Sequence, residues 1–192
     1  MSTKERIVYE AMRAFASKGY EGTTLAEIAT NVGIKKPSLY NHFKNKDELY
    51  LVVAEKVMNE LIEELRKSIE TFTHQDLEQH VRQSLEQSCE FIIKKHEGMM
   101  YKRFMIFPPV AIHKEVKAIV RDGDERMNAQ LVTLYNRGIE ENQFHHLSKE
   151  QFIASYFCLL DGLFTESFIY EERDFRQRFD HAWDVFWRGV CY

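Results

Sequence analysis

The sequence is poor in the residues that interrupt helices. Its 192 residues include only three prolines and eight glycines. Few stretches alternate apolar with polar side chains, as half-buried strands do. Apolar residues instead recur at helical spacing through most of the chain. We predict an all-α protein.

Features of secreted and membrane-bound proteins are also missing. The first residues are charged and lead directly into an amphipathic pattern, without the apolar stretch of a signal peptide. The uncharged run at residues 151–160 is far shorter than the roughly 20 residues of a membrane span. The three cysteines are isolated, which is typical of buried thiols in a reducing cytoplasm, with a redox-sensing thiol as the alternative. We expect a cytoplasmic protein without membrane contact.

Motifs of common enzymes are absent from the sequence. It contains no H-E-x-x-H, no G-x-S-x-G, no phosphate-binding glycine loop and no Cys/His metal spacing. His145 and His146 form an isolated pair, which provides too few ligands for a metal. We therefore expect no catalytic residues, no metal, no cofactor and no enzymatic activity.

Charge is distributed unevenly along the chain. Residues 1–47 contain eight Lys/Arg and five Asp/Glu, a net charge of +3, whereas residues 48–192 contain 18 and 25, a net charge of −7. A basic head on an acidic body suggests that the head meets a polyanion. Chance is the alternative explanation for so small an excess.

Two short helices joined by a tight turn are predicted within the basic head. Thr24 and Glu27 have the spacing of a capping box, and the helix that they begin ends at Gly33. Pro37 suits the first turn of a second helix, where Leu39 and Phe43 share one apolar face. This arrangement is typical of a helix-turn-helix, whose second helix enters the major groove of DNA.

The stretch TTLAEIATNVGIKKPSLYNHFKNKDEL, residues 23–49, resembles the DNA-binding region of the TetR family of bacterial transcriptional regulators. Paired threonines, an IA…G turn and an LY-x-HF-x-x-K-x-EL run recur here in the family's order. The resemblance implies an N-terminal three-helix helix-turn-helix domain. It implies phosphate contacts from Thr24, Tyr40, His42 and Lys46, and base or near-base contacts from Lys36, Pro37, Ser38 and Asn41.

One position departs from the family pattern. Ser or Thr usually precedes the recognition helix in the family, and here the position is Lys35. A lysine cannot accept the capping hydrogen bond. We therefore assign Lys35 to phosphate attraction and expect a weaker start to the helix.

The remaining three quarters of the chain also show helical periodicity. A long helix should begin near Asn45, and Gly98 should interrupt the helix that contains residues 77–92. Further helices are expected from residues 114, 148 and 174. The resemblance implies that this body is a regulatory domain with a small-molecule pocket, whose last two helices form a homodimer.

Met and aromatic side chains form adaptable apolar walls and are the best candidates for the pocket, although an ordinary core is the alternative for each. The pocket candidates are Met100, Phe104, Met105, Phe107, Tyr135, Phe157 and Phe164. The last two helices carry more apolar residues than one buried stripe needs, which favours an isologous interface over burial within one subunit. The interface candidates are Phe175, Phe179, Trp183, Phe186 and Trp187.

We thus expect a DNA-binding domain at residues 1–47 and a helical ligand-binding and dimerisation domain at residues 48–192. The predicted function is a transcriptional regulator, most simply a repressor, that binds a palindromic operator in double-stranded DNA. A small apolar or aromatic effector should release the operator. The alternative is a helical protein-interaction module or an architectural DNA-binding protein without an effector.

Overall fold

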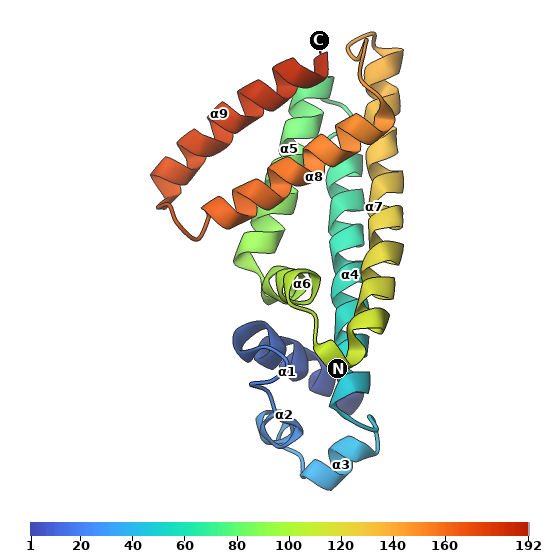
Figure 1. Ribbon diagram of the computed structural model, residues 1–192, viewed down its shortest axis with the longest axis vertical. Coiled ribbons are helices and arrows are strands. Elements are labelled where there is room, and N and C mark those ends of the chain that lie inside the picture. Colours follow the sequence, from blue (N-terminus) through green and yellow to red (C-terminus); the bar gives the residue numbers. More distant parts are fainter. Residues whose placement is uncertain (192) are drawn as a thin grey trace. The chain divides into compact units, whose positions relative to one another are not determined.

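The computed structural model describes residues 1–191, and all regular structure in this range is helical (Figure 1). The prediction of an all-α protein is confirmed. No helix in the described range has the length and apolar character needed to cross a bilayer. The α-helices are α1 (Thr3–Lys18), α2 (Leu25–Val32), α3 (Lys36–Tyr40), α4 (Lys46–Thr71), α5 (Leu77–Lys94), α6 (His96–Ile106), α7 (His113–Glu140), α8 (Lys149–Glu166) and α9 (Glu172–Cys191), and a 3₁₀ helix, η1, spans Val110–Ile112.

The chain forms two compact units, each built from two stretches of sequence. The first unit comprises Met1–Leu61 and Lys94–Gly123, and the second comprises Ile62–Ile93 and the chain from Asp124 onward. Helices α4 and α7 therefore contribute residues to both units. The predicted DNA-binding segment lies entirely within the first unit, and the functional boundary at residue 47 stays a prediction.

Helix α1 is fixed at both ends and along one face. The Ser2 hydroxyl accepts a hydrogen bond from the Glu5 N–H, and the Glu5 carboxylate accepts one from the Ser2 N–H, which completes a capping box. At the other end Gly19 has a φ of +72°, a conformation that glycine adopts without strain. Ile7 and Phe15 are fully buried, and α1 packs against α2 and α6.

The predicted capping box of α2 is only half formed. The Thr24 hydroxyl accepts a hydrogen bond of 3.2 Å from the Glu27 N–H. The Glu27 carboxylate, however, forms an ion pair with Lys18 of α1. The expected reciprocal bond is thus replaced by a link between two helices.

The helix break expected at Gly98 lies earlier in the chain. Helix α5 ends at Lys94 and α6 begins at His96, so Gly98 is inside α6, where it is buried. Glycine in a helix interior costs only about 1 kcal/mol relative to alanine. Packing of α6 offsets a penalty of that size.

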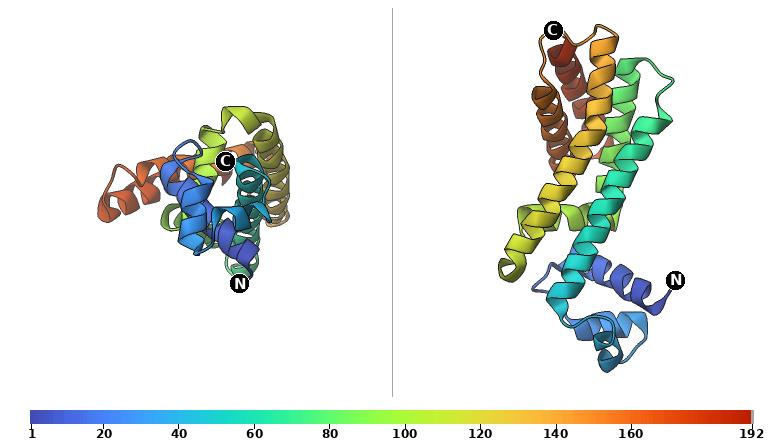
Figure 2. Two further views of the ribbon diagram at one scale, coloured as in Figure 1. Left: turned by 90° about the horizontal axis from the view of Figure 1, so that it is seen from below. Right: turned by 90° about the vertical axis from the view of Figure 1, so that its right-hand side faces the viewer.

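The second unit has a continuous apolar core. Helix α8 begins with the predicted capping box of Ser148 and Gln151, and α8 and α9 lie side by side (Figures 1 and 2). The fully buried side chains of this unit include Leu77, Val81, Leu85, Leu131, Leu134, Phe152, Tyr156 and Trp183.

A buried histidine joins three segments of the second unit. Nε2 of His80 lies 2.6 Å from the Ile69 carbonyl oxygen at the end of α4, so this nitrogen carries the proton and donates. Nδ1 accepts from Arg137 of α7 at 2.9 Å, and the same guanidinium donates to the carbonyl oxygens of Gln75 and Thr73 at 2.6 and 3.4 Å. Burial, together with the charge of Arg137, lowers the pKa of His80.

Acid should therefore destabilise the second unit through His80. Its pKa is lower in the folded than in the unfolded chain, so unfolding takes up a proton as the pH falls below about 6.5. This contribution to the free energy of unfolding is complete above that pH and is lost below it, by at most about 1.4 kcal/mol per pH unit. Urea denaturation between pH 7.5 and 5 measures it.

The His80→Gln variant should lose this component of the pH dependence. His74 is exposed, and His74→Gln is the matched control that should keep it. A pH profile that is the same in His80→Gln as in the unchanged protein would contradict the assignment.

Candidate nucleic-acid interface

Helix α3, the predicted recognition helix, is five residues long and is positioned by its neighbours. Leu39 on its inner face is fully buried, and Phe43 in the turn that follows is 2% exposed. The turn before it is formed by Gly33, whose φ of +78° lies in the left-handed region. The Ile34 N–H donates to the Ala29 carbonyl oxygen at 2.9 Å and closes the end of α2. These contacts make a helix-turn-helix.

The start of α3 has no side-chain cap. Lys35 occupies the N-cap position with extended backbone, and it makes no capping hydrogen bond. The missing cap agrees with the reasoning from the sequence, and a weaker start to the helix stays a prediction. Pro37 lies in the first turn, where its missing N–H leaves no backbone bond unmade.

The structure brings most of the predicted DNA-contacting residues to the surface of the first unit. His42 and Lys46 are half-buried. Tyr40 is 47% exposed, and the Lys36 ammonium lies 6.0 Å from the centre of its ring. The exposed members of the predicted set are Thr24, Lys35, Lys36, Pro37, Ser38, Tyr40 and Asn41.

Lys46 is held within the protein, in a way that the sequence did not indicate. Its ammonium donates to the carbonyl oxygens of Tyr20 and Thr23 at 2.9 and 3.3 Å and lies 4.0 Å from the centre of the Tyr20 ring. The Tyr20 hydroxyl donates to Asp47, and burial with this bond raises the pKa of Tyr20. Lys46 thus ties the start of α4 to the turn between α1 and α2.

Two other basic side chains near the N-terminus also act internally. Arg6 donates to the Val32 carbonyl oxygen at 2.5 Å, at the end of α2. The ammonium of Lys4 lies 5.6 Å from the centre of the Phe43 ring. Both contacts join α1 to the helix-turn-helix. These two basic side chains therefore stabilise the fold of residues 1–47 and also contribute to its positive electrostatic potential.

Arg103 joins α6 to α1 inside the first unit. Its Nε donates to the Ala16 carbonyl oxygen at 2.5 Å, and its Nη2 donates to that of Ser17 at 2.8 Å. These carbonyls belong to the last turn of α1, which has no helical partners for them and has a partial negative charge. Arg103 thus holds the end of α1 against α6. Sequence reasoning did not single out Arg103, because its partners lie more than 80 residues away.

Comparison with known proteins agrees with this geometry. The family model of bacterial regulatory proteins of the tetR family matches residues 7–53. The chain is 30% identical over 177 residues to the biofilm operon icaADBC negative transcriptional regulator IcaR of Staphylococcus epidermidis, which covers 92% of this chain and 86% of that protein. The chain belongs to the TetR family. The expected family and the N-terminal helix-turn-helix are confirmed.

Two further similarities were found, one in sequence and one in fold. Over 97 residues, 50% of this chain and 42% of the relative, it is 33% identical to the transcriptional activator FasR of Mycolicibacterium smegmatis. The transcriptional regulator FadR from Bacillus subtilis, solved in complex with stearoyl-CoA, superimposes with a TM-score of 0.71 at 14% identity and covers 97% of this chain and 98% of its own. At that identity the second similarity concerns the fold alone.

The predicted pocket residues of this TetR-family protein are divided between the two units. Met100, Phe104, Met105 and Phe107 belong to the first unit, and Tyr135, Phe157 and Phe164 belong to the second. Phe107 is 77% exposed, so it does not line an enclosed apolar pocket. The Tyr135 hydroxyl donates to the Leu147 carbonyl oxygen at 2.9 Å. Assignment of these residues to an effector stays a prediction.

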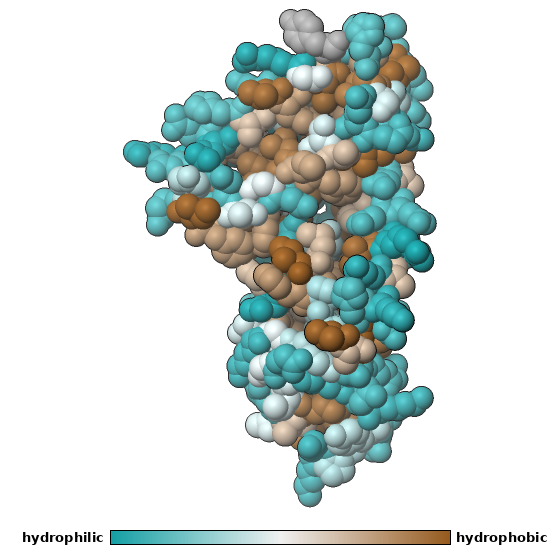
Figure 3. Space-filling view, in the orientation of Figure 1, coloured by the Kyte–Doolittle hydropathy of each residue, from teal (hydrophilic) through white to brown (hydrophobic). Residues whose placement is uncertain are grey.

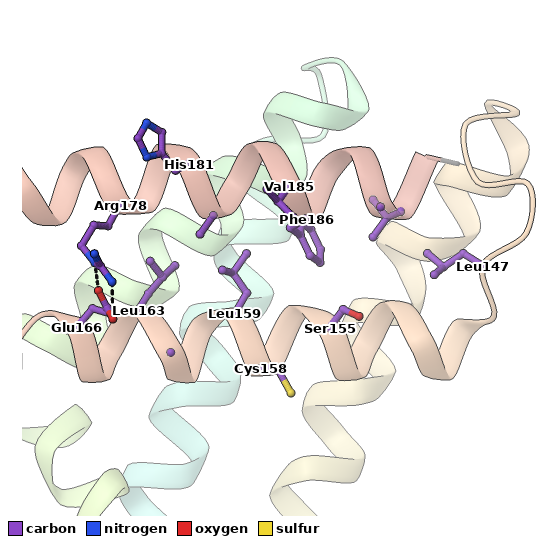
Figure 4. A pocket seen from close by; sticks show the side chains of 14 residues that line it. Leu147, Ser155, Cys158, Leu159, Leu163, Glu166, Arg178, His181, Val185 and Phe186 are labelled. Atoms are coloured by element: carbon purple, nitrogen blue, oxygen red, sulfur yellow. Dashed lines mark hydrogen bonds and ion pairs between the residues drawn. The ribbon is translucent and has the colours of Figure 1, made fainter.

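A groove runs between α8 and α9 in the second unit (Figure 4). Leu159 and Phe186 point into it from the two helices, and an ion pair between Arg178 and Glu166 closes one end. Figure 3 shows apolar surface along α8. The residues that line the groove are Leu147, Ser155, Cys158, Leu159, Gly162, Leu163, Glu166, Arg178, His181, Ala182, Val185, Phe186, Gly189 and Val190.

The predicted dimer residues lie mostly outside this groove, on a neighbouring face of α9. Phe179 and Trp183 are 2% and 0% exposed within the chain, so they have no surface left for a partner. Trp187 stacks on Trp183 with ring centres 5.6 Å apart. Of the five predicted residues, Phe186 lines the groove. The aromatic stripe that suggested an interface is therefore largely the inner face of the helix.

Lys46 and Lys44 should differ in their effect on stability. Lys46→Met removes the donor to two carbonyls and should lower the free energy of unfolding by about 1.5–3 kcal/mol. Lys44 is exposed, so Lys44→Met, which removes the same charge, should change it by less than about 0.5 kcal/mol. Thermal and urea denaturation measure the difference. Equal stability of the two variants would refute the structural role of Lys46.

Proposed function

We propose that this protein is a repressor that binds a palindromic operator as a homodimer and releases it when a small molecule binds the C-terminal domain. The observation that carries the proposal is α3, a helix with one buried anchor, Leu39, and polar side chains over its outer surface. Such a helix is suited to insertion into a major groove about 12 Å wide. The similarity of the whole chain to IcaR, a negative transcriptional regulator, favours repression over activation.

The exposed lysines of the head supply attraction to DNA. Lys35, Lys36 and Lys44 are all exposed around α3. Each lysine that neutralises a phosphate releases a counterion, so binding should weaken as salt rises. Lys46 is engaged by two carbonyls, and we propose that it orients the start of α4 and contributes its charge to the same field.

Sequence readout is assigned to the outer residues of α3 and the turn after it. The Asn41 amide suits the N6 and N7 atoms of adenine, and Lys36 suits the O6 and N7 atoms of guanine. Ser38 accompanies them on the exposed side. Thr24, Tyr40 and His42 are assigned to phosphates, which set the register of the protein on the duplex.

A homodimer is proposed to form through the groove between α8 and α9. Val185 is 72% exposed in the single chain, and a Cβ built at Gly162 or Gly189 meets no atom within 4 Å. Small residues of this kind allow helices of a second copy to approach closely. An isologous pair of these faces gives two heads, which matches the two half-sites of a palindrome.

The effector is proposed to act through the connection between α6 and α1. A ligand with different affinities for two states of the body shifts the population between them. Arg103 bonds α6 to the last turn of α1, and Lys46 bonds the start of α4 to the turn after it, so we propose that displacement of α6 or α4 changes the spacing of the two heads. We propose that effector binding and release of the operator take place in the bacterial cytoplasm, which contains the DNA.

A randomised DNA pool tests the DNA-binding proposal. We expect enrichment of one palindrome by a dimer, with affinity that falls steeply between 50 and 200 mM salt. Asn41→Ala should cost about 1–3 kcal/mol and relax the preference at one base pair of each half-site. Lys35→Ala, at the lysine assigned to phosphate attraction, should weaken binding to all sequences alike and reduce the salt slope by about 1.

Lys117 is exposed on α7 in the same unit, and Lys117→Ala is the matched control with little expected effect. Failure to enrich any palindrome at any salt would sink the proposal and favour a protein-interaction module. Enrichment of bent DNA without sequence preference would favour an architectural protein.

The dimer surface is tested by a charge in the groove. Val185→Lys places an ammonium at the centre of the proposed interface, and its desolvation should raise the dimer dissociation constant at least a hundredfold. Gln177 is exposed on α9 outside the groove, so Gln177→Lys should leave the dimer intact. Light scattering after gel filtration and sedimentation equilibrium measure both. A stable Val185→Lys dimer would place the interface elsewhere.

A further inference from the structure

Three strongly exposed apolar side chains lie between the end of α6 and the start of α7. Ile106, Phe107 and Val110 are 54%, 77% and 94% exposed. Pro109 is buried and Ile112 is 5% exposed, so the same segment is anchored in the first unit. Apolar side chains that are held outward by an anchored backbone are typical of a surface that meets a partner.

Basic side chains continue this surface along α7. Lys114, Lys117 and Arg121 are exposed, and their spacing of three and four residues places them on one face of the helix. None of them forms an ion pair within the described part of the chain. The stretch Lys94–Gly123 contains seven Lys/Arg and three Asp/Glu, a net charge of +4, although residues 48–192 as a whole have −7. Together with the three exposed apolar side chains, these cations make up the basic apolar surface of the first unit.

The turn between α8 and α9 has the opposite charge and a similar apolar content. Phe168 and Ile169 are 61% and 67% exposed, and Glu171 and Glu172 are exposed as well. Neither carboxylate is paired with a cation of the described chain. The Phe168 ring packs edge-on against Phe164, with ring centres 4.9 Å apart, which fixes one side of the turn. The four exposed residues make up the acidic apolar turn of the second unit.

The two surfaces are complementary in both of their properties. Removal of exposed apolar side chains from water favours association, and unpaired charges of opposite sign select the partner and its orientation. Both surfaces are exposed in the single chain, so neither covers the other there. A second copy of the chain brings the matching surface to each of them.

The acidic apolar turn is continuous with the proposed dimer interface. It lies in the sequence between Glu166 and Arg178, and the ion pair of these two residues closes one end of the groove between α8 and α9. A second copy that occupies the groove therefore passes close to the turn. An isologous pair makes every contact twice, so one such dimer can cover both turns and both basic apolar surfaces. This continuity favours a second copy over another anionic partner, such as a membrane surface.

We propose that, in the homodimer, the acidic apolar turn of each copy docks on the basic apolar surface of the other. This inference rests on the proposed function, because it requires a dimer, and it adds a contact outside the groove. The docked turn joins the second unit of one copy to the DNA-binding unit of the other. Each DNA-binding unit is thereby restrained by the partner copy as well as by its own chain.

Cross-linking of the unchanged protein tests the contact directly. A carbodiimide joins a lysine ammonium to a carboxylate without a spacer, so it reports groups that are in contact. Isotopically labelled and unlabelled chains are mixed, allowed to exchange and treated with the carbodiimide, and the peptides are identified by mass spectrometry. We expect Lys114 or Lys117 of one copy to be joined to Glu171 or Glu172 of the other. A dimer without this link between copies, or with the link only within one chain, would contradict the proposal.

Reversal of the charges provides a second test. Neutralisation of a single exposed lysine has little effect, whereas reversal places like charges opposite each other. Lys114→Glu/Lys117→Glu should therefore raise the dimer dissociation constant about tenfold or more, and so should Glu171→Lys/Glu172→Lys. The variant with all four substitutions should return to within about threefold of the unchanged protein. Sedimentation of fluorescently labelled protein without DNA measures the dissociation constants.

Lys35 and Lys44 are exposed in the same unit, and Lys35→Glu/Lys44→Glu is the matched control that should leave the dimer unchanged. Unchanged dimers in both reversed pairs, or no restoration in the combined variant, would overturn the proposal. Vesicles of phosphatidylglycerol test the membrane alternative. Binding to them that is lost in Lys114→Glu/Lys117→Glu, while the dimer is unchanged, would overturn the proposal in favour of a membrane surface.

The outcomes separate this contact from the proposed function. A dimer that enriches a palindrome but forms no link between the two surfaces would keep the repressor and refute the contact. A dimer that forms the link and enriches no palindrome would support the contact and refute the repressor.

Discussion

The burial of Leu39 is the contact on which DNA recognition depends. A helix of five residues does not form alone in water, because the cost of its first turn is not recovered over so short a length. Helix α3 therefore exists because the core beneath it, with Ile7, Phe15, Ile28 and Leu49 fully buried, holds its inner face. The polar side chains on the other faces of α3 are not needed for packing, so they are available to contact DNA.

Long basic side chains that reach backbone carbonyls form a second level of organisation. Arg6, Lys46 and Arg103 each donate to carbonyl oxygens at or near the ends of helices in the first unit, and Arg137 does so in the second. The last carbonyls of a helix lack internal hydrogen-bond partners and carry partial negative charge. A basic side chain donates hydrogen bonds to these oxygens and also neutralises part of that charge. Several basic residues of the first unit thus connect its helices to one another.

Internal bonds of basic side chains are the feature that the sequence alone did not predict. Motif spacing identified α2, the Gly33 turn and α3 because caps, turns and helical periodicity act over three or four residues. Lys46 occupies the lysine position of the TetR-family motif, and yet its ammonium is bonded to the carbonyl oxygens of Tyr20 and Thr23. Those partners lie more than 20 residues away, and local patterns contain no information on such pairs. The same reason explains the capping residue Glu27, which pairs with Lys18.

The sequence by itself determined the helical class, the family, the helix-turn-helix and most helix starts, because each depends on short-range chemistry. Only the tertiary structure decided which of several apolar stripes faces inward. Phe179 and Trp183 of α9 are buried in the core. The side of α9 that lines the groove combines the small residues Ala182 and Gly189 and the exposed Val185 with polar and larger apolar side chains. Burial is a property of the whole packing, in which every helix competes for the same interior.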